Sequence, residues 1–483
     1  MFFISIILGF IIVYLLHLNN NRVKNGPPTP PHLPLIGNLH MIDKGKPYES
    51  LHKLYLQYGK IYSIYMGSIY TVVLNDSKLI HEAFTTQSEV FKDRYLGPSL
   101  LIVGDEKDLS FSNGELWKKL RTLFGMTLTR TKLMKFETII LDQVSKLIAA
   151  IKRDIAKGQP IQLKKYTHTY TLNCMFQFTF SAEITYDSEQ RNDEEKEIMY
   201  LAEELTKLMV QGNPSDFIHI LKPFFNHHEI EKVVSGILSF SRRRIVEHQK
   251  TLDRNNPRDF VDLFLIEMEN DPEHTYTIEH IERNCLDLMV AGTDTAATTV
   301  EWAVLMMINR PEIQELLYQE IVEKSPSNKP VSWSNKTQLP LFYSAIKEGF
   351  RLKPTSPLLL PHQTVEDTTL AGYFIPKGTQ VIANVYTSCI SEQQWKDPLT
   401  FNPSRFIGDD KSPASFGDGP RKCVGMQMGE MMVYDALGNL YRELQFERTT
   451  KALVDESPHP GLLYEAPNYD LLARPRTKPP PHQ

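Results

Sequence analysis

Residues 416–425 read F-G-D-G-P-R-K-C-V-G, and this stretch decides how the whole chain is interpreted. Its two central glycines and its proline break regular secondary structure, so the stretch predicts a loop. Residues 426–444 have helical periodicity, which places Cys423 just before the N-terminal end of a predicted helix. Such an end carries unsatisfied N–H groups and a partial positive charge, and both favour a thiolate over a thiol.

A cysteine in this position has several possible uses: a catalytic nucleophile, a zinc ligand or an axial ligand of haem iron. A nucleophile needs a nearby base, and the linear sequence pairs no histidine with Cys423. Zinc needs several ligands at close spacing, but Cys174, Cys285 and Cys389 all lie more than about thirty residues away. A dinucleotide-binding loop would need a third glycine where Lys422 stands. A buried, inert cysteine is the simplest alternative.

The spacing Phe-x-x-Gly-x-Arg-x-Cys-x-Gly is met at Phe416, Gly419, Arg421, Cys423 and Gly425. It resembles the haem-binding loop of the cytochrome P-450 family. The resemblance implies that Cys423 is the metal ligand of haem b, where a thiolate donates electron density that favours O–O cleavage. It also implies that Arg421 binds a haem propionate, that Phe416 covers the proximal side, and that the glycines let backbone N–H groups approach the sulfur.

Composition and periodicity predict a mainly α-helical fold with a smaller β portion. The 483 residues are 41% hydrophobic with a formal net charge of −5, which favours neither a nucleic-acid-binding protein nor a disordered chain. Four scattered cysteines disfavour a disulfide framework and fit a reducing compartment. Residues 48–58 predict a helix, residues 60–75 two strands and residues 371–384 a hairpin, with helical patterns over most of the rest.

An apolar run at the N-terminus predicts a membrane anchor. Residues 2–16 read FFISIILGFIIVYLL, and the run extends to Leu18 across His17. As a helix it spans about 26 Å, close to the roughly 27 Å of the endoplasmic reticulum bilayer. A cleaved signal peptide is the alternative, but no Lys or Arg precedes the run and no small-residue cleavage site follows it. Arg22 and Lys24 come after it, so the positive-inside rule places the remainder in the cytosol.

The segment after the anchor is rich in proline. Residues 26–34 read G-P-P-T-P-P-H-L-P and predict a stiff connector, because proline lacks an N–H donor and fixes φ. It resembles the hinge of microsomal members of the family. The sequence therefore divides into a transmembrane anchor over residues 1–18, a proline-rich hinge over residues 19–38 and a haem-binding monooxygenase domain over residues 39–483.

Residues 281–310 predict a long helix with A-G-T-D-T at 291–295. One face carries small residues, which allow the close approach of a large flat group, and threonines whose hydroxyls can bond the i−4 carbonyl and open the helix locally. That face comprises Leu288, Ala291, Gly292, Thr295 and Thr299. The alternative is that another helix packs against Gly292 and that Thr295 is a satisfied core hydroxyl.

The same segment resembles the oxygen-binding groove of the family. The resemblance implies that Ala291 and Gly292 border the haem, and that Asp294 and Thr295 deliver protons to dioxygen. Ala296 stands where the family pattern has a second hydroxyl residue. Thr295 then acts alone, and the coupling of electron use to product is an open question. Well-timed proton supply is general acid catalysis, worth about 10²–10⁴-fold.

Two further segments resemble contacts of the family with haem propionates. Trp117 and Arg121 lie four residues apart and therefore share a helix face. His362 stands where the family often has an arginine or histidine on a propionate. Without the resemblance, these residues also fit a half-buried tryptophan beside a surface arginine, and an ordinary loop histidine.

Glu348 and Arg351 lie three residues apart on a predicted helix. An exposed pair of this kind stabilises a helix by only about 0.2–0.5 kcal/mol. However, E-x-x-R resembles a buried ion pair of the family, completed by the arginine of an F-x-P-x-R-F segment, here Arg405. The trio predicts an element for folding and for the haem cradle, with no catalytic part.

Together these motifs predict a membrane-anchored monooxygenase that inserts one oxygen atom from O2 into a lipophilic substrate. The sequence has no Rossmann or flavin motif, so electrons are expected from NADPH–cytochrome P-450 reductase, with cytochrome b5 as a second donor. The expected location is the endoplasmic reticulum membrane, with the catalytic domain on the cytosolic side. The resemblance implies that the substrate pocket draws on residues 95–103, 208–221, 357–360 and 461–464. These segments are largely apolar, which favours a lipophilic substrate and leaves its class open.

Two other classes of function stay open from the sequence. The same loop supports haem enzymes that rearrange peroxides or dehydrate oximes without a reductase, although the acid and alcohol at Asp294 and Thr295 argue against them. A non-catalytic haem-binding or gas-sensing membrane protein is the second class.

Overall fold

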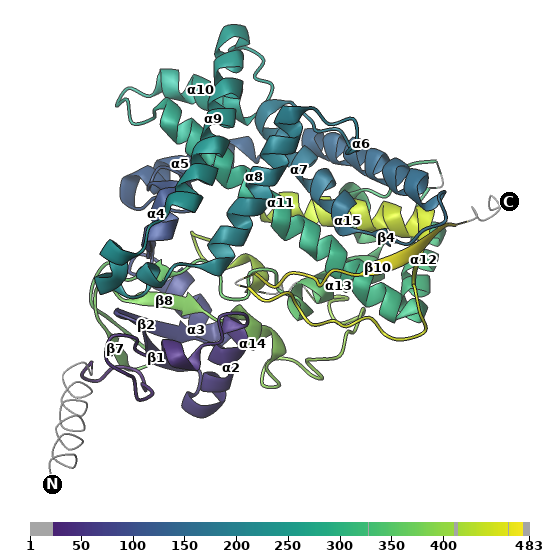
Figure 1. Ribbon diagram of the computed structural model, residues 1–483. Coiled ribbons are helices and arrows are strands. Elements are labelled where there is room, and N and C mark those ends of the chain that lie inside the picture. Colours follow the sequence, from purple (N-terminus) through teal and green to yellow (C-terminus); the bar gives the residue numbers. More distant parts are fainter. Residues whose placement is uncertain (1–22, 327, 410–413, 462, 477–483) are drawn as a thin grey trace.

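The computed structural model describes residues 23–326, 328–409, 414–461 and 463–476. Helices fill most of the molecule, and the larger sheet lies in the lower left of Figure 1. The predicted mainly helical class with a smaller β portion is therefore confirmed. The predicted anchor, residues 1–18, lies outside the described residues. No helix within the described ranges is both long enough and apolar enough to cross a membrane.

The α-helices run in the order α2 to α15. Their bounds are α2 Pro47–Tyr58, α3 Ser77–His81, α4 Pro98–Gly104, α5 Gly114–Thr127, α6 Arg130–Ile155, α7 Lys164–Phe180, α8 Asp193–Gln211, α9 His228–Thr251, α10 Phe260–Asn270, α11 Ile278–Asn309, α12 Pro311–Lys324, α13 Pro340–Leu352, α14 Val385–Ile390 and α15 Met426–Glu443. The short helices are η1 Leu39–Met41, η3 Pro214–Asp216, η4 His219–Phe224, η5 Trp333–Gln338 and η6 Ala414–Phe416, with a π-helical turn η2 at Glu82–Thr86.

Strands form three sheets, in the orders β1-β2-β8-β5-β3, β4-β10-β9 and β6-β7. Their bounds are β1 Ile61–Met66, β2 Ile69–Leu74, β3 Asp93–Arg94, β4 Ile161–Gln162, β5 His362–Gln363, β6 Thr368–Leu370, β7 Tyr373–Ile375, β8 Gln380–Ala383, β9 Leu444–Arg448 and β10 Asp470–Pro475. The two strands predicted over residues 60–75 are confirmed as the antiparallel pair β1 and β2.

The hairpin predicted over residues 371–384 is wrong. β7 pairs with β6, whereas β8 runs parallel to β2 in the larger sheet. The chain turns between them at Pro376 and Gly378, where Thr364 donates to the Pro376 carbonyl over 2.7 Å and Gly378 has a φ of 80°. The range does contain two strands and a turn, but the partner of each strand depends on distant segments that a local pattern does not contain.

Helix α11 is the long helix predicted over residues 281–310, and it runs through the centre of the molecule (Figure 1). Its N-terminus is fixed by a capping box, in which the Thr277 N–H donates to His280 Nδ1 over 3.1 Å. The helix packs against α7, α9 and α15. Most of its side chains are buried because neighbours cover it on several sides.

The proline-rich segment is fastened to the sheet. The Ser63 N–H on β1 donates to the Pro28 carbonyl over 2.9 Å. Asn38 extends this contact, because its amide donates to the Pro31 carbonyl over 3.0 Å and accepts from the Tyr65 N–H over 2.9 Å. Residues 28–38 of the predicted hinge are therefore held along β1 as part of the folded unit.

Candidate haem site

The loop that carries Cys423 joins η6 to α15 and closes on itself. The Cys423 N–H donates to the Phe416 carbonyl over 2.8 Å, and the Lys422 N–H donates to the Gly419 carbonyl over 3.1 Å. Gly417 and Gly419 have φ angles of 76° and 70°, which glycine adopts without steric penalty. The predicted loop before a helix is confirmed, and the thiol lies at the N-terminal end of α15.

Gly419 is required by a close approach as well as by its φ. A Cβ atom at this position would collide with the main-chain carbonyl of Phe84 in η2. Asp418 secures the same contact, because its carboxylate lies 2.8 Å from His81 Nδ1 and accepts from Thr85 Oγ1 over 2.8 Å. The loop is thus clamped onto the segment that follows β2.

The environment of Cys423 combines exposure with burial. Its side chain is exposed, whereas the other three cysteines are buried. Yet burial is the largest influence on the thiol and raises its pKa, while a hydrogen bond from the Gly425 N–H and the charge of Arg121 lower the pKa by less. The side chain can be both exposed and surrounded by protein if the thiol faces a space inside the molecule. The helix end alone therefore does not produce the predicted thiolate, whereas a bound metal cation would deprotonate the thiol.

Arg421 of this loop lies beside Arg94 of β3. Arg421 donates from Nε to the Lys92 carbonyl over 2.7 Å and from Nη2 to the Ser112 carbonyl over 2.8 Å. Its guanidinium lies 4.1 Å from the centre of the buried Trp117 ring. Arg94 Nη2 lies 3.5 Å from the Arg421 carbonyl. Both guanidiniums are held by main-chain carbonyls and an aromatic face, which leaves their charges unneutralised.

Three arginines around the loop, Arg94, Arg121 and Arg421, fit a ligand that carries carboxylate groups. Burial and neighbouring arginines lower the pKa of Arg94 and of Arg421, and burial lowers that of Arg121. Within the described ranges none of the three pairs with a carboxylate, and Arg94 Nε and Arg421 Nη1 have no hydrogen-bond partner. Buried donors are normally satisfied, and guanidinium forks match carboxylates. The two propionates of haem have the required charge.

His362 lies on β5, close to the same arginines. Its ring stacks on Phe84 with centroids 3.8 Å apart, and its Nδ1 donates to the Phe91 carbonyl over 2.6 Å. Burial, and then the charge of Arg94, lower the pKa of His362 well below its ordinary value. Because Nδ1 is already used, the ring would donate to a carboxylate from Nε2 only after protonation, which a nearby anion favours.

The middle of α11, where the sequence predicts a groove, is partly open to solvent. Ala291 is exposed, although most of the helix is buried. Thr295 donates to the Ala291 carbonyl over 2.6 Å, and Thr299 donates to the Thr295 carbonyl over 2.7 Å, which is the predicted i−4 bonding. Gly292 has a different explanation, since a Cβ there would collide with Met175 of α7. Helix packing accounts for this glycine.

Asp294 reaches away from this groove, toward α7 and α8. Its carboxylate accepts a hydrogen bond from Thr206 of α8, and Oδ1 lies 3.4 Å from His168 Nδ1 on α7. Burial raises the pKa of Asp294, and the Thr206 hydrogen bond lowers it by less. A carboxyl group with a raised pKa next to Thr295 is suited to hold a proton and release it.

Glu348 is the centre of a buried ion network. Glu348 and Arg351 are both fully buried, and Arg351 donates to the two carboxylate oxygens over 2.8 and 2.9 Å. Arg405 Nε lies 3.0 Å from each of these oxygens, and its Nη atoms donate to three main-chain carbonyls of residues 396–400. The network fastens α13 to the segment that leads into the Cys423 loop.

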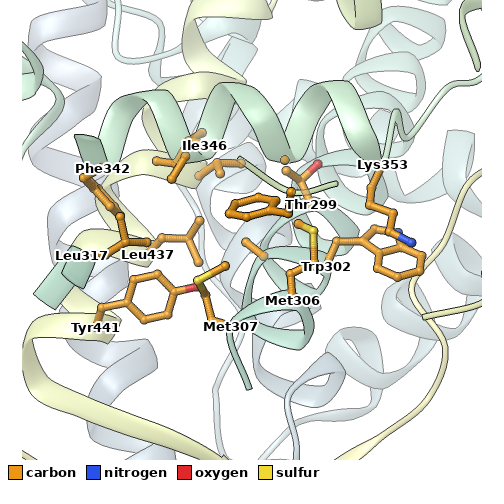
Figure 2. Close-up of a pocket in the computed structure, with 15 residues that line it drawn as sticks. Thr299, Trp302, Met306, Met307, Leu317, Phe342, Ile346, Lys353, Leu437 and Tyr441 are labelled. Atoms are coloured by element: carbon orange, nitrogen blue, oxygen red, sulfur yellow. The ribbon is translucent and has the colours of Figure 1, made fainter. Parts of the chain in front are cut away.

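A separate small cavity lies between α11, α12, α13 and α15 (Figure 2). Figure 2 shows Trp302, Met306, Phe342 and Leu437 around it, with Lys353 at one end. Its volume of about 20 Å³ is enough for one water molecule. This space is a packing gap in the helical core and is too small for a cofactor or a lipophilic substrate.

Arg94 and Asn113 are site residues that the sequence analysis missed. Arg94 lies in β3, outside every motif, and no local signal marks it. Asn113 precedes α5, and its side chain accepts from the Arg94 N–H over 2.8 Å and from Arg421 Nη2 over 3.1 Å. Its place four residues before Trp117, at the start of a predicted helix, was the only available signal.

Comparisons with known proteins agree with this geometry. A sequence model of the cytochrome P-450 family matches residues 27–473. A probable cytochrome P-450 of Dictyostelium discoideum, 515A1, is 32% identical over 481 residues, which cover 94% of this chain and 96% of that protein. Another from the same organism, 516B1, is 29% identical, covering 96% of this chain and 98% of that protein.

Among solved structures, that of a zebra fish cytochrome P-450 with progesterone has a similar fold. The TM-score is 0.80 at 24% sequence identity, and the match covers 89% of this chain and 99% of that one. The family and its fold bind haem iron through a cysteine thiolate. The chain belongs to the cytochrome P-450 family of haem-thiolate monooxygenases.

Proposed function

We propose that this chain is a microsomal monooxygenase that inserts one oxygen atom of O2 into a lipophilic substrate, with electrons from NADPH. The observation that carries the proposal is the acid and alcohol pair on α11. Thr295 donates a hydrogen bond to the carbonyl of the exposed Ala291, and the neighbouring Asp294 has a raised pKa. Haem enzymes that rearrange peroxides need no proton delivery to dioxygen, so this pair favours a monooxygenase.

The residues present divide into clear roles toward haem, whose iron supplies the oxygen-activating chemistry when it is bound. Cys423 would ligate the iron, with the Gly425 N–H donating to the sulfur and Phe416 covering that side. The propionates would lie among five cationic or donor side chains, which are Arg94, Trp117, Arg121, His362 and Arg421. Gly419 keeps the loop in place. Glu348 and Arg351 of α13, with Arg405, support the segment that leads into the loop.

A lipophilic substrate is supported by apolar side chains that are not fully buried. In α4, Leu101 is 39% exposed, and Leu100 and Ile102 are partly buried. Leu358 and Leu360, in the segment before β5, are also partly buried. Because the chain has no dinucleotide-binding fingerprint, we assign electron supply to NADPH–cytochrome P-450 reductase, with cytochrome b5 as a second donor.

We also propose attachment to the endoplasmic reticulum membrane, with a transmembrane anchor at residues 1–18, a hinge over 19–38 and the catalytic domain, 39–483, in the cytosol. In η4, Ile220 is 64% exposed and Phe224 is 79% exposed. The Ser68 N–H in the β1–β2 turn donates to the Phe217 carbonyl over 2.8 Å, which holds this apolar segment beside the strand that carries the hinge. Exposed apolar side chains of this kind mark contact surfaces.

Thr295→Ala is expected to raise the hydrogen peroxide released per NADPH consumed by at least about threefold, because the variant loses the side-chain hydroxyl that adjoins Asp294 and that the proposal assigns to proton delivery. The measurement is a reconstituted assay with NADPH–cytochrome P-450 reductase, using progesterone and lauric acid as probes. The matched control is Thr293→Val, whose hydroxyl is buried and has no hydrogen-bond partner among the described residues. Equal peroxide release in both variants would mean that protons enter elsewhere, and turnover without NADPH would contradict the proposed function.

Deleting residues 1–18 is expected to release the protein from membranes, since the proposed anchor supplies most of the apolar insertion. The full-length chain should stay in the membrane pellet after a carbonate wash, and the shortened chain should move to the supernatant. If the shortened chain stays in the pellet, residues 1–18 are not the main attachment. The double substitution Phe224→Ser with Phe225→Ser in that shortened chain then tests η4.

A further inference from the structure

We propose that His168 carries protons from solvent to Asp294, with Glu301 as its second partner. This inference rests on the proposed function, because it extends the proton supply at Thr295. His168 lies on α7, and its two ring nitrogens approach two carboxylates of α11. Nδ1 is 3.4 Å from Asp294 Oδ1, and Nε2 is 3.5 Å from Glu301 Oε1. Asp294 and Glu301 are seven residues apart, or two helical turns, so one ring can lie between them.

Of these three side chains, His168 is the most exposed to solvent, as expected for the residue at which protons enter. The His168 side chain is 26% exposed, against 16% for Asp294 and 4% for Glu301. His168 is therefore the member of the group that solvent reaches most easily. Asp294 is next to Thr295, whose hydroxyl donates to the Ala291 carbonyl. His168 therefore links solvent to Asp294, which adjoins Thr295 in the chain, and Glu301 contacts the other ring nitrogen.

The other contacts hold both carboxylates in position. Thr206 of α8 donates to Asp294 Oδ2, and Thr167 of α7 donates to Glu301 Oε1 over 2.5 Å. The charged and titratable groups that face the ring come from four elements, and they are Asp294 and Glu301 of α11, Lys164 of α7, Glu203 of α8 and Glu465 of the C-terminal segment. The His168 ring, which can gain and lose a proton, is thus surrounded mainly by carboxylates.

The surroundings of His168, Asp294 and Glu301 shift their pKa values toward one another. Burial is the largest influence on His168 and lowers its pKa, whereas the charge of Glu301 raises it by less. Burial raises the pKa of Asp294 and of Glu301. An imidazole with a lowered pKa and carboxyls with raised pKa values exchange protons at a small free-energy difference, which a relay requires.

The transfer step conserves protons. His168 gains a proton at Nε2 from solvent or from Glu301, which makes the ring an imidazolium. It then loses the proton at Nδ1 to Asp294 Oδ1, so the carboxylate becomes a carboxylic acid and the ring becomes neutral again. A change of tautomer, with the Nε2 proton returned to Nδ1 through solvent, restores the starting state. No electron moves in these steps.

His168→Gln tests the relay, because glutamine keeps hydrogen-bonding atoms but cannot transfer a proton. We expect peroxide release per NADPH to rise at least about twofold. In the unchanged protein this ratio should increase as the pH rises through the pKa of His168, which burial places below the ordinary histidine value, because fewer His168 rings then carry a proton; the variant should lose that increase. His52→Gln is the matched control, since His52 is also partly buried and bonds a hydroxyl, Thr387 Oγ1, at 3.1 Å in a different part of the fold.

A second readout does not depend on turnover. In the resting holoenzyme with 13C-labelled histidine, Glu301→Gln should lower the NMR titration midpoint of His168 by about half a pH unit, since it removes a charge that raises that pKa. An unchanged midpoint, or unchanged coupling and pH profile in His168→Gln while Thr295→Ala releases more peroxide, would overturn the relay alone. Unchanged coupling in Thr295→Ala as well would overturn the proposed proton route as a whole.

Discussion

Cys423→Ala is expected to abolish the strongly red-shifted Soret band that the reduced protein forms with CO, and with it monooxygenase turnover. The reason is that the thiolate is the only sulfur ligand that the loop offers, and its electron donation favours O–O cleavage. Losing a residue that merely supports a metal ligand typically costs about 10–100-fold in metal affinity or activity, so the loss of the ligand itself should exceed that range.

The matched control for this prediction is Cys174→Ala, which removes a buried cysteine on α7 and should leave the CO spectrum unchanged. Because an alanine variant that loses haem can also lose its fold, Cys423→His provides a second measurement. It should keep haem and show the unshifted band of histidine ligation. A red-shifted band that survives in Cys423→Ala would refute the assignment of the ligand.

Glu348→Leu is expected to lower the free energy of unfolding by about 3–5 kcal/mol, because it leaves the guanidiniums of Arg351 and Arg405 without their shared anion. Urea denaturation followed by far-UV circular dichroism measures the change. Glu269→Leu is a matched control, since Glu269 also forms a two-bond pair with an arginine, Arg254, at 2.7 and 2.8 Å. That pair is exposed to solvent, so its loss should lower the free energy of unfolding far less than the loss of the buried network does.

A third variant separates the cost of leaving a buried charge unpaired from the net stabilisation that the ion network contributes. The triple substitution Glu348→Leu, Arg351→Met and Arg405→Met removes all three charges together, and most of the lost stability should return. Equal effects of Glu348→Leu and Glu269→Leu would show that the buried network contributes no more than an exposed pair. The haem content of each variant then shows whether the network also holds the cofactor loop.

Features fixed by neighbours in the sequence could be predicted from it, and features fixed by distant segments could not. The Cys423 loop, the helix after it and the i−4 bonding of the α11 threonines follow from glycine, threonine and apolar spacing within about thirty residues. Arg94 became visible only when the fold brought β3 beside Arg421. The direction of the Cys423 pKa shift depended on burial, which a helix-end argument leaves out.

The hairpin and Gly292 show the same limit. The hairpin predicted over residues 371–384 was wrong, because β8 pairs with β2 from the far N-terminal part of the chain. The sequence left open whether Gly292 borders the cofactor or a packed helix, and the structure places Met175 of α7 against it. A glycine on a helix permits a close approach, and the sequence does not say from which side.

The clamp on the Cys423 loop has a consequence for the kinetics of folding. Its contacts join residues very far apart in the chain, with separations of 337 for Asp418 and His81, 329 for Arg421 and Lys92, and 309 for Arg421 and Ser112. Closing such long loops costs entropy and slows the formation of structure. During synthesis, the N-terminal half of the site must wait for most of the chain to leave the ribosome. We therefore expect haem to be captured after translation, by a nearly complete chain that exposes apolar surface until then.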